Sequence, residues 1–171
     1  MADDLRAAIT MGYRILQLDE MMVTKRTFPT CDWSKLRQNT HLDLSQTNTD
    51  PIAVLGAVSR EKGVELVMTF PRSVNVPKFK VFLEELRARN PFDQICLVLD
   101  NLAVHRNQHA VGRMRELGFR WTFTPISSPE YNGGIESTWS QSKKWIKEQR
   151  LNAIVNKKKI DLKEMVEKSF K

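Results

Sequence analysis

Ile95-Cys-Leu-Val-Leu-Asp100-Asn101 is the stretch of sequence that does most to decide the fold of this chain. Its five leading residues are all apolar, which is typical of a central strand buried on both of its faces. The apolar run stops at Asp100 and Asn101. We therefore expect a sheet that is covered on both faces, with an acidic residue where its central strand ends.

On either side of this strand, apolar residues follow alternating helix and strand patterns. Phe79, Phe82, Leu83 and Leu86 form one stripe of a helix that begins after Pro77. In chain order we expect a helix over 2–11, strands over 13–19, 52–58 and 64–70, the helix after residue 77, the strand over 95–99, a helix over 110–117, a strand over 120–124 and a helix after residue 134. The polar stretch over 24–50 is expected to form a long excursion or a ragged hairpin.

This order of elements predicts a mixed sheet. The first three strands favour antiparallel pairing, and the later alternation of helix and strand favours parallel strands joined by right-handed crossovers. The result is an α/β fold with a five-stranded mixed sheet flanked by helices, the arrangement of a ribonuclease H-like domain. We expect this domain over residues 1–150 and a basic, helical C-terminal tail over 151–171.

The composition is that of an ordinary globular protein. Of the 171 residues, 41% are hydrophobic and 27% are charged, which excludes a wholly disordered chain. The longest apolar run, Ile52–Val58, is too short to span a membrane, and no secretory signal is visible. Cys31 and Cys96 form no metal-binding or disulfide pattern. We expect an intracellular location, the nucleus in a eukaryotic host or the cytoplasm and nucleoid in a bacterial one, and no membrane partner.

The positive charge gathers at the C-terminal end. Residues 1–136 hold 17 Lys and Arg against 16 Asp and Glu, whereas residues 137–171 hold 10 against 4. A nearly neutral body with a basic end points to a polyanionic partner such as nucleic acid. On charge alone, the alternative is a solvated, lysine-rich terminal helix.

Three acidic residues stand at places where the expected elements meet. Asp19 ends the first strand, Asp100 ends the central strand, and Glu136 lies in the first turn of the last helix. Three neighbouring carboxylates repel one another unless a cation neutralises them, and oxygen ligands select Mg²⁺ or Mn²⁺. Two such ions about 4 Å apart assist in-line displacement at phosphorus. Taken singly, Asp100-Asn101 also fits a plain turn, and Glu136 also fits a helix-dipole acid.

Three motifs in order carry a resemblance to a known family. They are Leu18-Asp-Glu20, Leu97-Val-Leu-Asp-Asn-Leu-Ala-Val-His105, and Ser128-Pro-Glu-Tyr-Asn-Gly-Gly-Ile-Glu136, the last followed by Trp139 and Lys143. Over about residues 13–147 the chain resembles the DDE catalytic domain of mariner-type transposases. The resemblance implies that Asp19, Asp100 and Glu136 are the catalytic residues and the ligands of two Mg²⁺ or Mn²⁺ ions.

The chain departs from the family pattern in two ways. It has Asn132-Gly-Gly-Ile-Glu136 where the family has Asn-Pro-Ile-Glu, so 35 residues separate Asp100 from Glu136, one more than the commoner mariner-type spacing. Glu130 is the alternative third acid. Full-length relatives also begin with helix-turn-helix modules, and nothing before Tyr13 fits one. We therefore expect a catalytic core, a fragment or one member of a split system, with a separate or missing helix-turn-helix module as its partner.

Other residues are expected to support this chemistry. Asn101 is expected to orient Asp100 or a metal-bound water, and His105 either lies near the scissile phosphate or packs beneath Asp100. Trp139 and Trp145 are expected to pack in the core, and a zinc site on His105 and His109 is improbable. The other expected supports are Glu20 beside Asp19, Asn132 in the turn before Glu136, and the DNA-backbone contacts Lys143, Lys144 and Lys147.

The preferred function is therefore divalent-metal-dependent cleavage of a DNA phosphodiester followed by strand transfer, carried out by a homodimer on DNA. Two alternatives stay open. One is another ribonuclease H-like endonuclease, which cleaves without strand transfer. The other is a domesticated remnant that binds DNA without catalysis. Metal binding by the purified chain distinguishes the transposase and the other endonuclease from the inert remnant.

Overall fold

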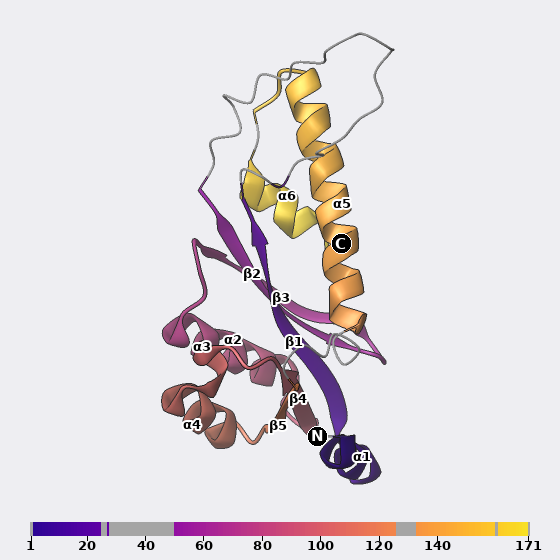
Figure 1. Ribbon diagram of the computed structural model, residues 1–171, viewed down its shortest axis with the longest axis vertical. Helices are drawn as coiled ribbons and strands as arrows, with labels where there is room; N and C mark the ends of the chain where they lie inside the picture. The colour runs from indigo at the N-terminus through magenta and orange to yellow at the C-terminus, as the bar shows by residue number, and fades with distance from the viewer. Residues whose placement is uncertain (1, 25–26, 28–49, 126–132, 160, 171) are drawn as a thin grey trace.

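The computed structural model describes residues 2–24, 27, 50–125, 133–159 and 161–170 (Figure 1). Its elements, in chain order, are α1 (Ala2–Thr10), β1 (Arg14–Val23), β2 (Ile52–Ser59), β3 (Gly63–Pro71), α2 (Val76–Arg89), β4 (Ile95–Leu99), α3 (Ala103–Arg106), α4 (Gln108–Glu116), β5 (Arg120–Phe123), α5 (Gly133–Val155) and α6 (Leu162–Lys168).

The strands form one mixed sheet in the order β3-β2-β1-β4-β5. β1 pairs antiparallel with β2, and β2 pairs antiparallel with β3. β1 pairs parallel with β4, and β4 pairs parallel with β5. The expected five-stranded mixed sheet is confirmed, with the first strand at its centre and the buried strand β4 beside it.

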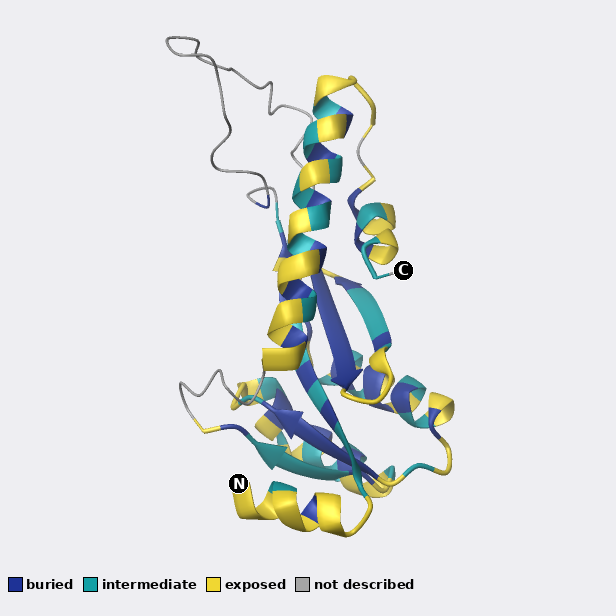
Figure 2. Cartoon of the chain, turned by 90° about the vertical axis from the view of Figure 1, so that its right-hand side faces the viewer, coloured by how far each residue is buried: buried dark blue, intermediate teal, exposed yellow. Residues whose placement is uncertain are grey.

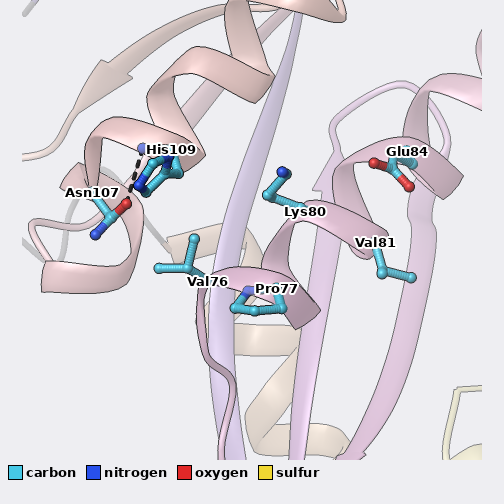
Figure 3. A pocket seen from close by; sticks show the side chains of 7 residues that line it. All are labelled: Val76, Pro77, Lys80, Val81, Glu84, Asn107 and His109. Atoms are coloured by element: carbon cyan, nitrogen blue, oxygen red, sulfur yellow. Dashed lines mark hydrogen bonds between the residues drawn. The ribbon is translucent and has the colours of Figure 1, made fainter.

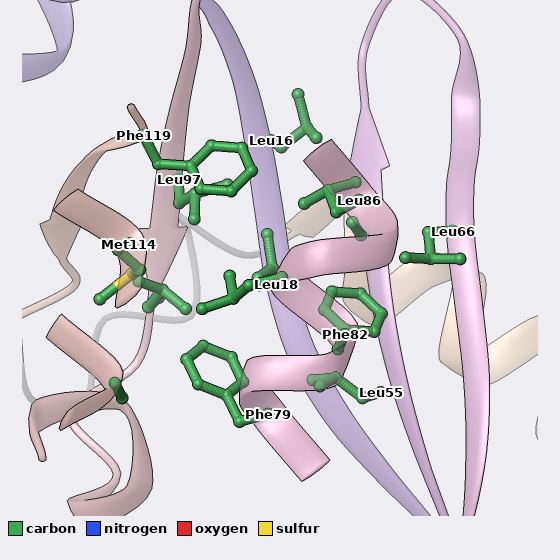
Figure 4. Close-up of a cluster of buried hydrophobic side chains, with 14 of the residues drawn as sticks. Leu16, Leu18, Leu55, Leu66, Phe79, Phe82, Leu86, Leu97, Met114 and Phe119 are labelled. Carbon is green, nitrogen blue, oxygen red and sulfur yellow. The ribbon is translucent and has the colours of Figure 1, made fainter. Parts of the chain in front are cut away.

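Helices cover the two faces of the sheet. α2, α3 and α4 pack on one face, where Phe79 and Phe82 of α2 lie against Leu18 and Leu55 of the strands (Figure 4). α5 and α6 pack on the other face (Figure 1). Figure 2 shows that α5 has buried, partly buried and exposed residues along its length, as expected of a helix packed on one side only. The stripe expected on α2 is confirmed, because all four of its apolar residues are fully buried.

The structure differs from the expected elements in two places that matter for the site. β1 does not end at Asp19 but continues to Val23, because Met21 and Val23 are buried against the α5 side of the sheet. Asp19 and Glu20 are therefore strand residues rather than strand-ending ones. The short helix α3, directly after Asp100, was not expected. The expected excursion over 24–50 lies outside the described residues except at its ends.

The C-terminal part of the described chain packs into the same core. α5 runs past residue 150 to Val155, and Leu162 and Val166 of α6 are buried in the cluster that α5 forms with the sheet. Arg150 is completely buried, and its Nη1 donates hydrogen bonds to the backbone oxygens of Thr24 and Thr27 at 2.7 and 3.1 Å. Among the described residues, no helix is long and apolar enough to cross a membrane.

Candidate active site

The sheet brings Asp19 and Asp100 to neighbouring positions. In the parallel β1–β4 ladder, Gln17 stands opposite Val98. Continued by two residues, this register places Asp19 beside Asp100. β4 ends at Leu99, whereas β1 continues along β2 with Asp19 opposite Gly56. The two aspartates therefore lie where β1 and β4 part.

Asp19 is held by two hydrogen bonds. Its Oδ1 accepts one from the backbone N–H of Glu20 at 2.8 Å, and its Oδ2 accepts one from the indole Nε1 of Trp139 at 3.0 Å. Burial raises the pKa of Asp19; the two hydrogen bonds oppose this, and the negative charges of Asp100 and Glu136 raise it further. Asp19 therefore lies close enough to Asp100 and to Glu136 for both of their charges to act on it.

His105 lies beneath Asp100 and joins it to Glu20. The side chain of His105 is completely buried, and its Nδ1 lies 2.7 Å from Oδ1 of Asp100. Because a carboxylate only accepts, Nδ1 carries the proton of this hydrogen bond. Nε2 lies 3.7 Å from Oε1 of Glu20 on the other side, and the ring of Phe79 packs at 4.8 Å between centroids.

This arrangement gives the neighbouring acids different pKa values. Burial alone raises the pKa of Asp100, but hydrogen bonds from His105 and from the backbone of Leu102 bring it below its usual value. The pKa of Glu20 is raised by burial; the charge of His105 lowers it, and those of Asp100 and Asp19 raise it. Asp100 is therefore more readily ionised than Asp19.

Glu136 lies in the first turn of α5 with its side chain exposed. The backbone N–H of the preceding residue, Ile135, donates to Oε1 of Gln17 at 3.1 Å, which holds this turn against β1. Within the ranges that the structure describes, no three Asp, Glu, His or Cys side chains lie close enough together to hold one metal ion. The strands bring Asp19 and Asp100 together, and the exposed Glu136 stands nearby.

The donors where β1 and β4 part are of the chemical type that a divalent cation prefers. They are carboxylate oxygens, the ligands that hard ions such as Mg²⁺ and Mn²⁺ prefer. Burial is the main cause of the raised pKa of Asp19, and the charges of Asp100 and Glu136 add to it; a cation bound beside these carboxylates would offset that charge repulsion.

Three further expected residues are Asn101, Glu130 and Asn132. The side-chain amide of Asn101 donates to the backbone oxygen of Thr124, which ties the loop after β4 to the end of β5. Glu130 and Asn132 lie outside the described residues.

The expected lysines lie further along α5. Lys143 and Lys147 follow Glu136 by seven and eleven residues, about two and three turns, and so lie on the same side of α5. Together with Ser140, Lys144 and Glu148 they line a hollow of about 410 Å³. These lysines form a basic surface along α5, on the C-terminal side of Glu136.

Two contacts at this site were missed in the sequence. Trp139 was expected to pack in the core, and its ring is indeed buried, but its N–H also binds Asp19. A buried indole N–H needs an acceptor, which was the available signal. Gln17 was not singled out, although its position two residues before Asp19 places it on the same face of the strand.

A second hollow, of about 490 Å³, lies away from the carboxylates between the beginnings of α2 and α4 (Figure 3). His109 borders it, and the backbone N–H of His109 donates to Oδ1 of Asn107 at 2.9 Å. His109 is exposed, whereas His105 is buried beneath Asp100. The two histidines therefore face different surroundings. The other residues that line this hollow are Val76, Pro77, Lys80, Val81 and Glu84.

Comparisons with known proteins identify the family of this chain and the fold that it shares. Residues 14–157 match the family model described as DDE superfamily endonuclease. No curated protein matches the sequence.

Two solved structures share the fold. The chain is similar to one from the simian T-cell lymphotropic virus intasome in complex with PP2A regulatory subunit B56 gamma, at 13% identity and a TM-score of 0.63, over 91% of this chain and 46% of that one. It is also similar to the Mos1 transposase in a paired-end complex with the left transposon end, at 14% identity and a TM-score of 0.51, over 75% of this chain and 41% of that one. The chain therefore spans less than half the length of either neighbour.

Proposed function

The chain belongs to the DDE superfamily endonucleases, and from this premise we propose that it is the catalytic domain of a mariner-type transposase. Its reaction is the cleavage of a DNA phosphodiester followed by strand transfer. One observation carries the proposal most directly. Asp19 and Asp100 stand side by side where β1 and β4 part, and the pKa of Asp19, raised first by burial, is raised further by the charges of Asp100 and Glu136.

Enzymes of this superfamily use divalent metal ions. We propose two Mg²⁺ or Mn²⁺ ions here, which Asp19, Asp100 and Glu136 would hold. When bound, such ions activate water and neutralise the charge that develops on the phosphate. The donor set and the repulsion among these carboxylates support the assignment.

The surrounding side chains hold the carboxylates in place. Trp139 fixes Oδ2 of Asp19, and His105 fixes Oδ1 of Asp100 from beneath. Because both donors are buried, each carboxylate is oriented before a ligand arrives. Hydrolysis of a phosphodiester frees a 3′-hydroxyl, which would then attack a phosphodiester of target DNA, forming a new phosphodiester bond and releasing the 3′-hydroxyl of the target strand.

DNA is the proposed partner, held along its backbone by Lys143, Lys144 and Lys147. A homodimer on DNA and a helix-turn-helix module that recognises the transposon ends follow from the resemblance to mariner-type enzymes. The basic face of α5 supports a sequence-independent contact with phosphates.

The proposal is tested by plasmid nicking in Mg²⁺ with Asp100→Asn and Asp19→Asn. Each change removes a negative ligand and preserves the shape of the side chain, so each is expected to abolish nicking while the circular dichroism spectrum stays that of the wild type. Asp3→Asn, an exposed carboxylate on α1, is the matched control and is expected to nick normally. Nicking that survives in both site variants contradicts the proposal.

The same assay separates the remaining alternatives. Comparison of Glu136→Gln with Glu130→Gln identifies the third acid, and we expect only the first to lose activity. Cleavage that never leads to strand transfer indicates another ribonuclease H-like endonuclease. Absence of metal binding together with absence of cleavage indicates an inert DNA-binding remnant.

A further inference from the structure

The start of α5 is fixed by a side chain from β1. Near the N-terminus of a helix, the backbone N–H groups have no partner within the helix. Here the N–H of Ile135 donates to Oε1 of Gln17 at 3.1 Å, across 118 residues of sequence. Gln17 stands two residues before Asp19 on the same strand face, and Ile135 directly precedes Glu136. One hydrogen bond therefore joins β1, which carries Asp19, to the helical turn that carries Glu136.

Gly134 makes room for this hydrogen bond. A Cβ atom built on Gly134 meets Oε1 of Gln17 at 2.7 Å, closer than two such atoms come in proteins. A Cβ atom built on the neighbouring Gly133 has nothing within 4 Å. A side chain at position 133 therefore meets nothing, whereas one at position 134 displaces the flexible end of Gln17, at little steric cost but with the loss of its hydrogen bond to Ile135.

A second contact fixes α5 one turn further on. Trp139, four residues after Ile135, donates its indole N–H to Asp19 at 3.0 Å. Glu136 lies between these two anchored residues, so its place along the sheet edge is set by both contacts. Of the two contacts, the one through Gln17 is nearer to Glu136 in sequence.

We infer that Gln17 and Gly134 act as a positioning pair that sets the turn of Glu136 against β1, and thereby its reach toward Asp19 and Asp100. The inference rests on the proposed function for the role of Glu136. It also gives a physical reason for Gly-Gly in place of the family's proline before the Ile-Glu pair. A proline at position 134 carries a Cβ atom, which would meet the amide of Gln17.

The pair is tested by a double-mutant cycle of Gln17→Leu and Gly134→Ala, with Gly133→Ala as the matched control. Hydrogen exchange of the Ile135 amide reports on the hydrogen bond itself. We expect each single variant to lower its protection about fivefold, the size of one typical hydrogen bond. The double variant is expected to be no worse than either single one, because both changes break the same hydrogen bond. Gly133→Ala gains the same helix propensity and is expected to keep full protection.

The functional consequence is measured by Mn²⁺ affinity, using electron paramagnetic resonance, and by the kinetics of nicking. Gln17→Leu and Gly134→Ala are expected to weaken Mn²⁺ binding about fivefold and to lower kcat by a similar factor, with KM for DNA unchanged. Gln17→Glu keeps the acceptor oxygen, so it is expected to restore the protection of Ile135. Thermal unfolding of every variant shows whether the chain is folded, and Gly134→Ala tests the hydrogen bond without altering β1.

The outcomes distinguish this inference from the proposed function. Unchanged protection of Ile135 in both single variants overturns the positioning pair. Lowered protection with unchanged Mn²⁺ affinity also overturns it, since the hydrogen bond is then structural only. A wild-type chain whose Mn²⁺ binding is absent, or survives Asp100→Asn, overturns the proposed function instead.

Discussion

Asp19 and Asp100 are neighbours where β4 ends beside β1, yet their surroundings shift their pKa values in opposite directions. Burial dominates at Asp19 and raises its pKa. At Asp100 burial also raises the pKa, but hydrogen bonds from His105 and the Leu102 backbone outweigh it, and the net shift is downward. Without a bound cation, ionised Asp19 therefore costs stability, whereas ionised Asp100 contributes it.

This difference predicts opposite pH dependences for Asp19→Asn and Asp100→Asn in the presence of a chelator. Both aspartates have an ordinary pKa of 3.8 when unfolded. The cost of ionised Asp19 appears as pH rises from this value through its raised folded pKa, so Asp19→Asn becomes more stable relative to wild type. The contribution of Asp100 is present above its unfolded pKa and is lost as pH falls through its lowered folded pKa, so Asp100→Asn is less stable at neutral pH.

Thermal unfolding between about pH 3 and pH 7 checks this prediction. The difference from wild type should move in opposite directions for the two variants as the pH rises. An amide has only one acceptor oxygen, so Asp19→Asn also loses one hydrogen bond at every pH. The quantity to compare is therefore how the stability difference from wild type changes with pH. Trends of the same sign in both variants would contradict the assigned environments.

At the scale of elements, the contact between β2 and α5 depends on a glycine in the middle of a strand. A Cβ atom built on Gly56 lies 2.3 Å from the ring of Trp139, well inside contact distance. Gly56 pairs with Asp19 in the β1–β2 ladder. The absence of a side chain at this position therefore lets the indole reach Asp19.

We predict that Gly56→Ala lowers the free energy of unfolding by about 1–3 kcal/mol, because the added methyl group overpacks a rigid aromatic ring. Trp139 is buried here, so its displacement should shift tryptophan fluorescence to longer wavelength. Gly112→Ala in α4 is the control, since nothing lies within 4 Å of its added Cβ atom. That change is expected to raise stability by up to about 1 kcal/mol through helix propensity. Equal stability of Gly56→Ala and wild type would show that α5 adjusts without cost.

At the scale of the whole molecule, the charge is divided between a nearly neutral body and a basic end. The last 35 residues hold 10 of the 27 Lys and Arg residues but only 4 of the 20 Asp and Glu residues. Two of these lysines, Lys143 and Lys147, lie on the same side of α5 as Glu136. On the proposed function, a DNA strand cleaved at the carboxylates would continue along this basic surface.

We predict that Lys143, Lys144 and Lys147 make DNA binding depend on salt but not on sequence. A triple change to alanine should lower the slope of log K against log salt by about one unit for each phosphate that a lysine no longer neutralises. Changing Lys157, Lys158 and Lys159 to alanine removes the same charge beyond the C-terminal end of α5, and is expected to alter the slope less.

Salt titrations of binding to transposon-end and random duplexes check this prediction. The wild-type chain should bind both duplexes about equally. An unchanged slope in the first variant would make these lysines a solvated face. A strong preference for one duplex would reveal a recognition element in this chain.

The sequence by itself determined which segments become strands and helices and where charge gathers. The apolar run of β4 and the stripe of α2 are local patterns, and burial in any compact fold requires them. The motifs around Asp19, Asp100 and Glu136 likewise identified the family. The extension of β1 past Asp19 was harder to predict from sequence, because the polar pair Asp19-Glu20 interrupts the apolar pattern of the strand.

Only the tertiary structure decided how these residues meet. Trp139 reaches Asp19 across 120 residues, and Gln17 reaches Ile135 across 118. Such contacts depend on the order of the strands, their register and the seat of α5 on the sheet, which no local pattern encodes. The space that Gly56 and Gly134 leave acquires meaning only when another element packs against it. Local periodicity reports burial, whereas the geometry of the site arises from packing between layers that are distant in the chain.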